Sequence, residues 1–184
     1  MQIKKTKING LFLFKFAKFE DERGFFVRNY CKREFEAVGG ISKISQANLS
    51  FNKKRGTLRG FHFQFDGFEE AKTVSVLSGA VHYKVIDLRK NSATYTQSES
   101  FDLDCFGWSV QVPAGCIPAF QTLDENVLLH YYVSEFYNPK KESGIRYNDP
   151  FFKLNWPLKV SEISERDQSF PDFNSENFQG LRSS

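Results

Sequence analysis

Residues 72–88 read KTVSVLSGAVHYKVIDL, and this stretch indicates the fold class of the chain. Apolar and polar side chains alternate on both sides of Ser78-Gly79, a turn signal between two strands. Similar short runs are separated by turn residues over a longer region, which predicts strands at 44–51, 57–64, 72–77, 80–88, 94–101, 108–112, 120–123 and 127–133. Strands at such regular intervals are typical of an all-β sandwich or barrel.

The segments on either side of this region have a different character. Residues 1–40 contain the hairpin signal Asn9-Gly10 and a short helical pattern from Lys32 to Val38. Residues 139–184 lose the alternation, and the motif from Ser164 to Asp167 predicts one helical turn there. We therefore predict a single domain over 1–184, with N-terminal strands and a short helix (1–40), a barrel (41–138) and a C-terminal covering segment (139–184).

The composition argues against several classes of protein. The formal net charge is only +3 and the basic residues are spread along the chain, so we predict no nucleic-acid surface. No apolar run reaches membrane-spanning length, and the N-terminal run is broken by Lys15 without a cleavage site. Three cysteines without metal-binding spacing predict reduced, buried thiols in a cytoplasmic protein.

Two polar side chains fall on the apolar faces of the predicted strands. Lys72 shares the face of Val74 and Val76, where an ammonium group is either functional or reaches solvent from the end of the strand. Tyr131 shares the face of Leu129, either as a core tyrosine with one hydrogen bond or as a proton donor.

His62 is the histidine with the strongest case for a chemical role. The alternation places it on the face opposite Arg59, whereas His82 is expected on the solvent surface. No second ligand stands near His62 in metal-binding spacing, so we predict no metal. The sequence also contains no glycine-rich phosphate loop and no nucleophile elbow. A histidine base, a lysine beside a carbonyl oxygen and a tyrosine acid would suit proton transfer through an enolate.

Motifs along nearly the whole chain carry a resemblance to one family. They are FEDERGFF at 19–26, QAN at 46–48, LRGFHFQ at 58–64, DLR at 87–89, VPAG at 112–115, NDP at 148–150, WP at 156–157 and SERD at 164–167. In them the sequence resembles the dTDP-4-dehydrorhamnose 3,5-epimerase family of nucleotide-sugar enzymes. The resemblance implies a cupin-type jelly-roll barrel with short peripheral helices and an irregular C-terminal covering segment. It also implies a homodimer that needs no cofactor and lends N-terminal segments to the neighbouring site.

The resemblance assigns roles to single positions. His62 matches the general base and Asp167 the carboxylate that orients it. Lys72 matches the cation beside the enolate, and Tyr131 the acid that reprotonates the opposite face. Arg23 and Arg59 match arginines that bind the diphosphate. The positions that match the substrate pocket as a whole are Phe19, Arg23, Arg28, Gln46, Asn48, Arg59, Pro118, Tyr137, Glu142 and Arg166. The implied activity is inversion of C3, C5 or both in a nucleotide-diphosphate-linked 4-keto-6-deoxyhexose, in deoxysugar biosynthesis.

Three positions depart from the family pattern. Pro118 stands where the family has a histidine, Arg28 where it has a glutamate, and Tyr83 where it has an aspartate near the lysine. Two other functions therefore stay open. One is a sugar 3,4-ketoisomerase of related fold, which the retained Lys72 and Tyr131 disfavour. The other is a non-catalytic protein that binds a nucleotide sugar.

Overall fold

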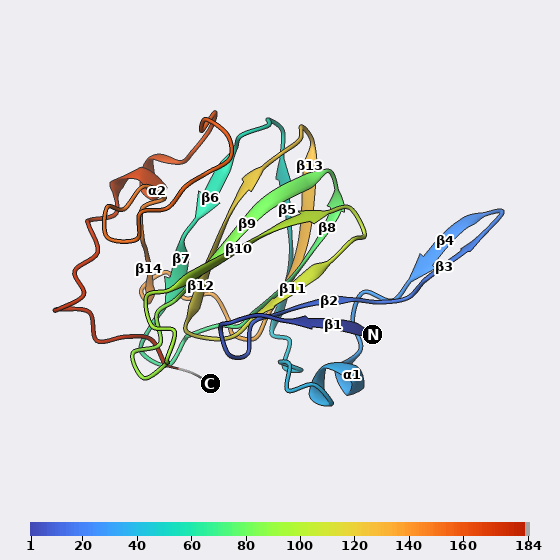
Figure 1. Cartoon of the computed structure of the whole chain (residues 1–184), viewed down its shortest axis with the longest axis horizontal. Coiled ribbons are helices and arrows are strands. Elements are labelled where there is room, and N and C mark those ends of the chain that lie inside the picture. The colour runs from blue at the N-terminus through green and yellow to red at the C-terminus, as the bar shows by residue number, and fades with distance from the viewer. Residues whose placement is uncertain (183–184) are drawn as a thin grey trace.

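The computed structural model describes residues 1–182 and is almost entirely β-structure (Figure 1). The strands are β1 (Gln2–Lys5), β2 (Phe12–Lys15), β3 (Lys18–Asp21), β4 (Gly24–Val27), β5 (Gln46–Asn52), β6 (Leu58–Gly60), β7 (His62–Gln64), β8 (Lys72–Ser78), β9 (Ala80–Asp87), β10 (Ser98–Asp104), β11 (Ser109–Val112), β12 (Cys116–Thr122), β13 (Val127–Val133) and β14 (Glu142–Gly144). The helices α1 (Lys32–Glu36) and α2 (Glu165–Ser169) have five residues each. Within residues 1–182, neither helix has the length and apolar character needed to cross a membrane.

Two antiparallel sheets form the barrel. The larger has the strand order β1-β2-β11-β8-β13-β5, and the smaller has the order β10-β9-β12-β6. Strands that are distant in the sequence are neighbours, as in a jelly roll: β13 lies between β8 and β5, and β12 lies between β9 and β6. The predicted all-β jelly-roll barrel is confirmed, and β1 and β2, from the N-terminal segment, are part of its larger sheet.

Two strands begin four residues away from the predicted position. β10 begins at Ser98 rather than Thr94, because Thr94 belongs to the loop between β9 and β10. Its hydroxyl donates to Asp87, at the end of β9, at 2.7 Å. β12 begins at Cys116 and so includes Pro118. Pro118 pairs with β9 on one side, whereas the pairing of β12 with β6 starts only at the next residue. A residue without an N–H group is tolerated where one neighbouring strand is missing.

The main hydrophobic core consists of alternate side chains of these strands. Val74 and Val76 of β8, Val81 and Val85 of β9 and Leu129 of β13 are all at most 3% exposed and belong to one cluster. The faces predicted from the alternation in β8 and β13 are therefore confirmed. The side chains that share those faces point to the inside of the barrel.

The C-terminal segment covers the outer side of the smaller sheet with aromatic rings. Ile86 and Ile117 of that sheet pack in a second cluster with Phe152 and Trp156. The same segment reaches His82, whose ring centroid lies 6.1 Å from that of Trp156 and whose side chain is 17% exposed. The prediction that His82 lies on the solvent surface is wrong, because this covering segment packs over it.

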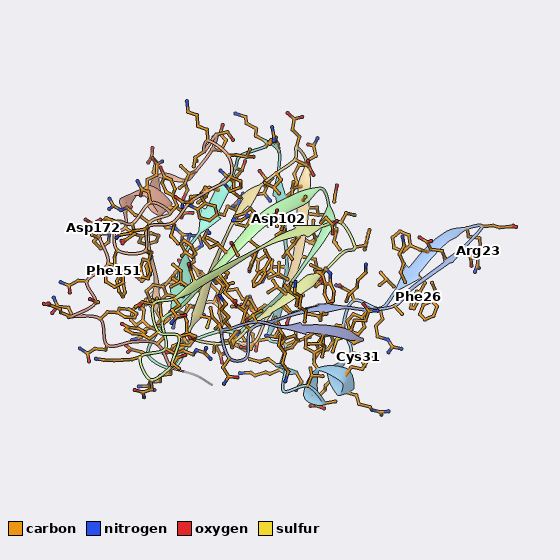
Figure 2. All side chains as sticks on the ribbon, viewed as in Figure 1. Arg23, Phe26, Cys31, Asp102, Phe151 and Asp172 are labelled. Carbon is orange, nitrogen blue, oxygen red and sulfur yellow. The ribbon has the colours of Figure 1, made fainter. Side chains whose placement is uncertain are left out.

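A two-stranded arm made of β3 and β4 projects from the barrel (Figure 1). Figure 2 shows Arg23 at the far end of the arm and Phe26 along it. Phe19 and Phe26 are 64% and 65% exposed. Exposed rings of this size on a protruding element mark a contact surface more often than a solvated one.

The three cysteines are all free, as the sequence predicts. Cys116 is buried, which confirms the expectation for that thiol, and Cys31 is half-buried. Cys105 is exposed, so the prediction of burial is wrong there. The reason is its position in the turn after β10, outside the barrel core.

Candidate active site

An open cavity of about 510 Å³ lies inside the barrel and is lined from both sheets. This volume is in the usual range for a small-molecule site. The predicted site residues on its wall are Gln46, Asn48, Arg59, His62, Lys72, Pro118, Tyr131, Tyr137, Glu142 and Arg166. Most of the positions singled out in the sequence therefore meet in one place, although they come from six separate parts of the chain.

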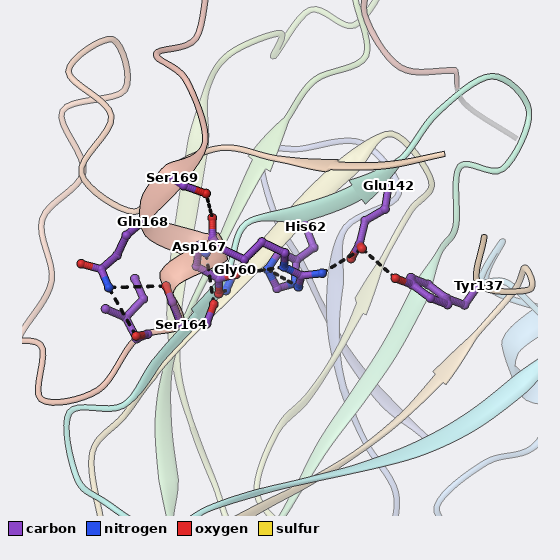
Figure 3. A network of polar contacts seen from close by, with 10 residues as sticks. Gly60, His62, Tyr137, Glu142, Ser164, Asp167, Gln168 and Ser169 are labelled. Atoms are coloured by element: carbon purple, nitrogen blue, oxygen red, sulfur yellow. Dashed lines mark hydrogen bonds and ion pairs between the residues drawn. The ribbon is translucent and has the colours of Figure 1, made fainter. Parts of the chain in front are cut away.

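His62 is held from behind by a buried carboxylate (Figure 3). Its Nε2 lies 2.7 Å from Oδ1 of Asp167, and Asp167 is only 2% exposed. The second carboxylate oxygen, Oδ2, accepts from the Gly60 amide at 3.2 Å. A histidine that lines a cavity and is fixed on its far side by an acid has the arrangement of a general base.

The pKa of Asp167 is lowered to about 2. Burial by itself would raise it, but the contact with His62 and the hydrogen bonds from the Gly60 amide and Ser164 outweigh burial. Asp167 is therefore ionised at neutral pH and accepts the proton of Nε2 of His62. That assignment leaves Nδ1 without a partner within residues 1–182 and able to accept a proton.

Helix α2 places this carboxylate. Ser164 is its N-cap, and the serine hydroxyl accepts from the Asp167 amide at 3.1 Å. The predicted helical turn at Ser164 is thus confirmed, and its first turn carries the acid that contacts His62. A cap of this kind stabilises a short helix that has little intrinsic stability.

Arg166 lies beside His62 and begins a chain of hydrogen bonds (Figure 3). Arg166 Nη2 lies 3.2 Å from Nε2 of His62, and its Nη1 donates to Glu142 Oε2 at 2.8 Å. The Tyr137 hydroxyl donates to the same glutamate oxygen at 2.8 Å. Arg166, Glu142 and Tyr137 therefore fix one another beside the base.

Lys72 and Tyr131 also line the cavity, from neighbouring strands of the larger sheet, of which β7 with His62 is not a part. In the register of β8 and β13, Lys72 is opposite Val133 and Tyr131 is opposite Val74. Lys72 Nζ contacts Glu70 Oε1 at 2.8 Å. The Tyr131 hydroxyl forms no hydrogen bond within the described part of the chain, so it is free to contact a ligand.

Arg59 and His62 line the same cavity, which corrects the prediction that they face opposite ways. The predicted strand is divided at Phe61 into β6 and β7, so the two-residue alternation does not continue across the division. Gly60 precedes the division with a φ of +112°, and a Cβ there would lie 2.6 Å from that of Ala119. Within residues 1–182, the Arg59 Nε donates to Asn52 Oδ1 at 2.7 Å and its terminal amino groups form no hydrogen bond, so they are available to a ligand.

Three predicted substrate-binding residues lie outside the cavity of their own chain. Phe19 and Arg23 belong to the arm, and Arg28 follows it. The Arg23 side chain is 90% exposed and contacts Asp21, and Arg28 donates to Glu34 at 2.9 Å. Their predicted contact with substrate stays a prediction and would need the arm of another copy.

Sequence reasoning missed Glu70 as a member of the cavity wall. The only signal was an acidic residue two positions before the inward-facing Lys72. Tyr83 also lines the cavity at 2% exposure, and burial raises the pKa of its hydroxyl. Within residues 1–182, no three metal-binding side chains cluster closely enough to hold an ion.

Known proteins resemble this chain along most of its length. The family model for dTDP-4-dehydrorhamnose 3,5-epimerase matches residues 5–175. The chain belongs to the dTDP-4-dehydrorhamnose 3,5-epimerase family. An epimerase of this family from Methanothermobacter thermautotrophicus is 32% identical over 170 residues, which is 90% of this chain and 91% of that protein. The family predicted from the sequence motifs is thus confirmed, and the protein is an epimerase.

Solved structures of the family have the same fold. The structure of dTDP-4-dehydrorhamnose 3,5-epimerase from Bacillus anthracis, with TDP and PPi bound, matches with a TM-score of 0.90 and 31% identity over 94% of this chain and 99% of that one. A 4-keto-6-deoxy sugar epimerase from the novobiocin gene cluster of Streptomyces spheroides matches with a TM-score of 0.86 and 33% identity over 94% and 87%. The cupin-type barrel is therefore confirmed.

Proposed function

We propose that this epimerase inverts C3, C5 or both in a nucleotide-diphosphate-linked 4-keto-6-deoxyhexose. The observation that carries the proposal is that His62 and Tyr131 line one cavity from different sheets, His62 from β7 and Tyr131 from β13 of the larger sheet. A base and an acid on opposite sides of a planar enolate invert the carbon between them. A binding protein without activity would not need this pair.

The proposed reaction moves one proton off the sugar and another onto it. Nδ1 of His62 takes the proton from the carbon next to the C4 ketone, and the electron pair of that C–H bond moves into the enolate. The Lys72 ammonium lies beside the enolate oxygen and stabilises its negative charge. The Tyr131 hydroxyl then gives its proton to the opposite face of the carbon, and exchange with solvent restores both residues.

The nucleotide end of the substrate is proposed to lie toward Arg59. The free amino groups of this guanidinium suit the paired oxygens of a diphosphate. The Bacillus anthracis relative holds TDP, and the Streptomyces spheroides relative is named for a 4-keto-6-deoxy sugar. The first supports a thymidine-linked substrate here, and the second supports a 4-keto-6-deoxy sugar.

We also propose a cytoplasmic homodimer in which each arm completes the cavity of the other copy. The exposed rings of Phe19 and Phe26 support this, and so does strand β5, an edge of the larger sheet on which Leu49 and Phe51 are 66% and 52% exposed. An apolar arm and an apolar open sheet edge are complementary surfaces. The partner's arm would carry the positions of Arg23 and Arg28 to the cavity.

Proton exchange in heavy water tests the activity. Purified protein is incubated with thymidine-, cytidine- and guanosine-linked 4-keto-6-deoxy sugars, and NMR follows deuterium at C3 and C5. Deuterium at either carbon with an inverted product supports the proposal. A ketone that moves from C4 to C3 supports the ketoisomerase instead, and tight binding without exchange on any of the sugars supports the binding protein.

Mixed dimers test the exchange of arms. Arg23→Ala removes a residue of the arm, and His62→Asn removes the base. If arms cross between copies, a mixture of the two variants contains sites with both an intact arm and an intact base. Activity above the sum of the separate variants is expected, and a simple sum would contradict the arm exchange.

A further inference from the structure

The loop between β7 and β8 brings a carboxylate into contact with the cavity lysine. Glu70 Oε1 lies 2.8 Å from Lys72 Nζ, and their side chains are 14% and 16% exposed. An ammonium group that has lost most of its water needs a partner of opposite charge. The contact therefore explains how Lys72 can lie on the same face as the buried valines of its strand.

Glu70 is itself held in place by a buried amide. Gln64 is 2% exposed, and its Nε2 lies 3.2 Å from Glu70 Oε2. The same nitrogen donates to the Phe136 carbonyl at 3.1 Å, and the Gln64 Oε1 accepts from the Asn138 amide at 2.6 Å. A carboxylate supported by an amide that also bonds three backbone groups, the Phe68 and Phe136 carbonyls and the Asn138 amide, has little freedom to move.

The other carboxylate on the cavity wall is already engaged. Glu142 accepts from Arg166 and from Tyr137, each at 2.8 Å. Within residues 1–182, Lys72 has no ion pair besides that with Glu70. Because an ammonium group has three donors, this contact leaves the others for a ligand in the cavity.

We propose that Glu70 is a positioning residue for Lys72 and that Gln64 supports it. The inference rests on the proposed function, in which Lys72 lies beside the enolate oxygen. Glu70 acts through Lys72 and does not touch the reacting carbon. Its loss therefore acts on the chemical step, where the enolate charge develops, and not on the binding of the nucleotide.

The variant Glu70→Gln tests this role, because it removes the charge and keeps the size of the side chain. We expect kcat for exchange at the sugar carbon to fall by about 10- to 100-fold, since a misplaced cation stabilises the enolate poorly. We expect KM to change by less than about threefold. Glu70→Asp keeps the charge and should recover part of kcat.

Glu69→Gln is the matched control. Glu69 is the adjacent acid, and its side chain accepts from the backbone amides of Gly67 and Arg182 outside the Lys72 contact. Its kcat should stay within about twofold of the original chain. Thermal unfolding of each variant shows whether the fold is intact.

A second measurement reports on the ion pair without any activity. Ammonium protons of a lysine give an NMR signal only when hydrogen bonds protect them from rapid exchange with water. The Lys72 signal, assigned by its loss in Lys72→Met, should persist in Glu69→Gln and disappear in Glu70→Gln. If the original chain brings no deuterium into any of the sugars, the proposed function fails. The Lys72 signal by itself then shows whether Glu70 holds the Lys72 ammonium group.

Two results would overturn the inference. One is a Glu70→Gln variant with an unchanged Lys72 signal. The other is a kinetic result for Glu70→Gln that does not fit positioning: either kcat stays within about twofold of the original chain, or KM rises by as large a factor as kcat falls.

Discussion

Two buried aspartates in this protein have the same acidity and different surroundings. Asp87 and Asp167 are 0% and 2% exposed, and the pKa of each is lowered to about 2. In both, burial alone would raise the pKa and hydrogen bonds to the carboxylate outweigh it. Asp87 receives these bonds from Arg89, Ser92 and Thr94, all from the loop that follows β9.

The partners of Asp167 come from another part of the chain. Its shortest side-chain contact, 2.7 Å, is with His62, which lines the cavity. A strongly lowered carboxyl pKa therefore marks a buried acid with good hydrogen bonds, whether or not the acid serves catalysis. The partners distinguish the two sites, because His62 lines the cavity that holds the predicted site residues, whereas the partners of Asp87 close a loop and line a different pocket.

The largest effect is expected at the imidazole that distinguishes the two sites. His62→Asn removes the proposed base, so the rate of deuterium exchange should fall by roughly 10² to 10⁴-fold. His82→Asn is the control, because His82 also contacts an aspartate, Asp102 at 2.7 Å, and lies outside the cavity. An exchange rate that survives His62→Asn would remove His62 from the role of base.

The next effect comes from neutralising each aspartate. Asp167→Asn should lower the exchange rate on the order of 100-fold, since the amide no longer fixes the proton on Nε2 of His62. Asp87→Asn should leave the exchange rate nearly unchanged and lower the free energy of unfolding by about 3 kcal/mol, because it leaves the largely buried Arg89 guanidinium without its acid. Equal losses of rate in the two variants would contradict the distinction.

The two aspartates should contribute alike to stability in acid. The folded-state pKa of each, about 2, lies below the unfolded value of 3.8, so each acid stabilises the fold above about pH 4. As the pH falls through 4 toward 2, protonation removes that contribution, roughly 2 kcal/mol for each acid. Denaturant unfolding between pH 5 and about 2 measures the drop, and Asp87→Asn or Asp167→Asn should reduce it.

The smallest effect is expected at the cap that holds Asp167. Ser164→Ala removes the hydroxyl that accepts from the Asp167 amide, and the free energy of unfolding should fall by about 1 kcal/mol. The exchange rate should fall only slightly, because His62 and Gly60 still hold the carboxylate. Ser169→Ala, at the other end of α2, is the control, and a larger loss of stability there would contradict the importance of the cap.

The period of two in the strands predicted most of the fold. It placed Lys72 with Val74 and Tyr131 with Leu129, because a regular strand keeps its alternation along its whole length. It failed between Arg59 and His62, where the strand is divided at Phe61. It also failed at His82, whose exposure depends on a segment more than seventy residues away in the sequence.

The site was predicted where residue type and motif agreed. His62 and Asp167 could be paired only through the family resemblance, since periodicity says nothing about residues from distant parts of the chain. Glu70 was missed because a loop has no period, and an acid near a lysine is usually a solvated pair. Its importance depends on the buried Gln64 behind it, which only the three-dimensional arrangement reveals.

The arm of β3 and β4 also bears on how the enzyme would respond to dilution. The groups proposed for proton transfer belong to one chain, whereas Arg23 and Arg28 would reach the substrate only from a second chain. Dilution that separates the copies would then lower the affinity for the diphosphate of the substrate first and leave the proton-transfer groups in place. Apparent KM would rise at low protein concentration before the turnover at saturating substrate declined.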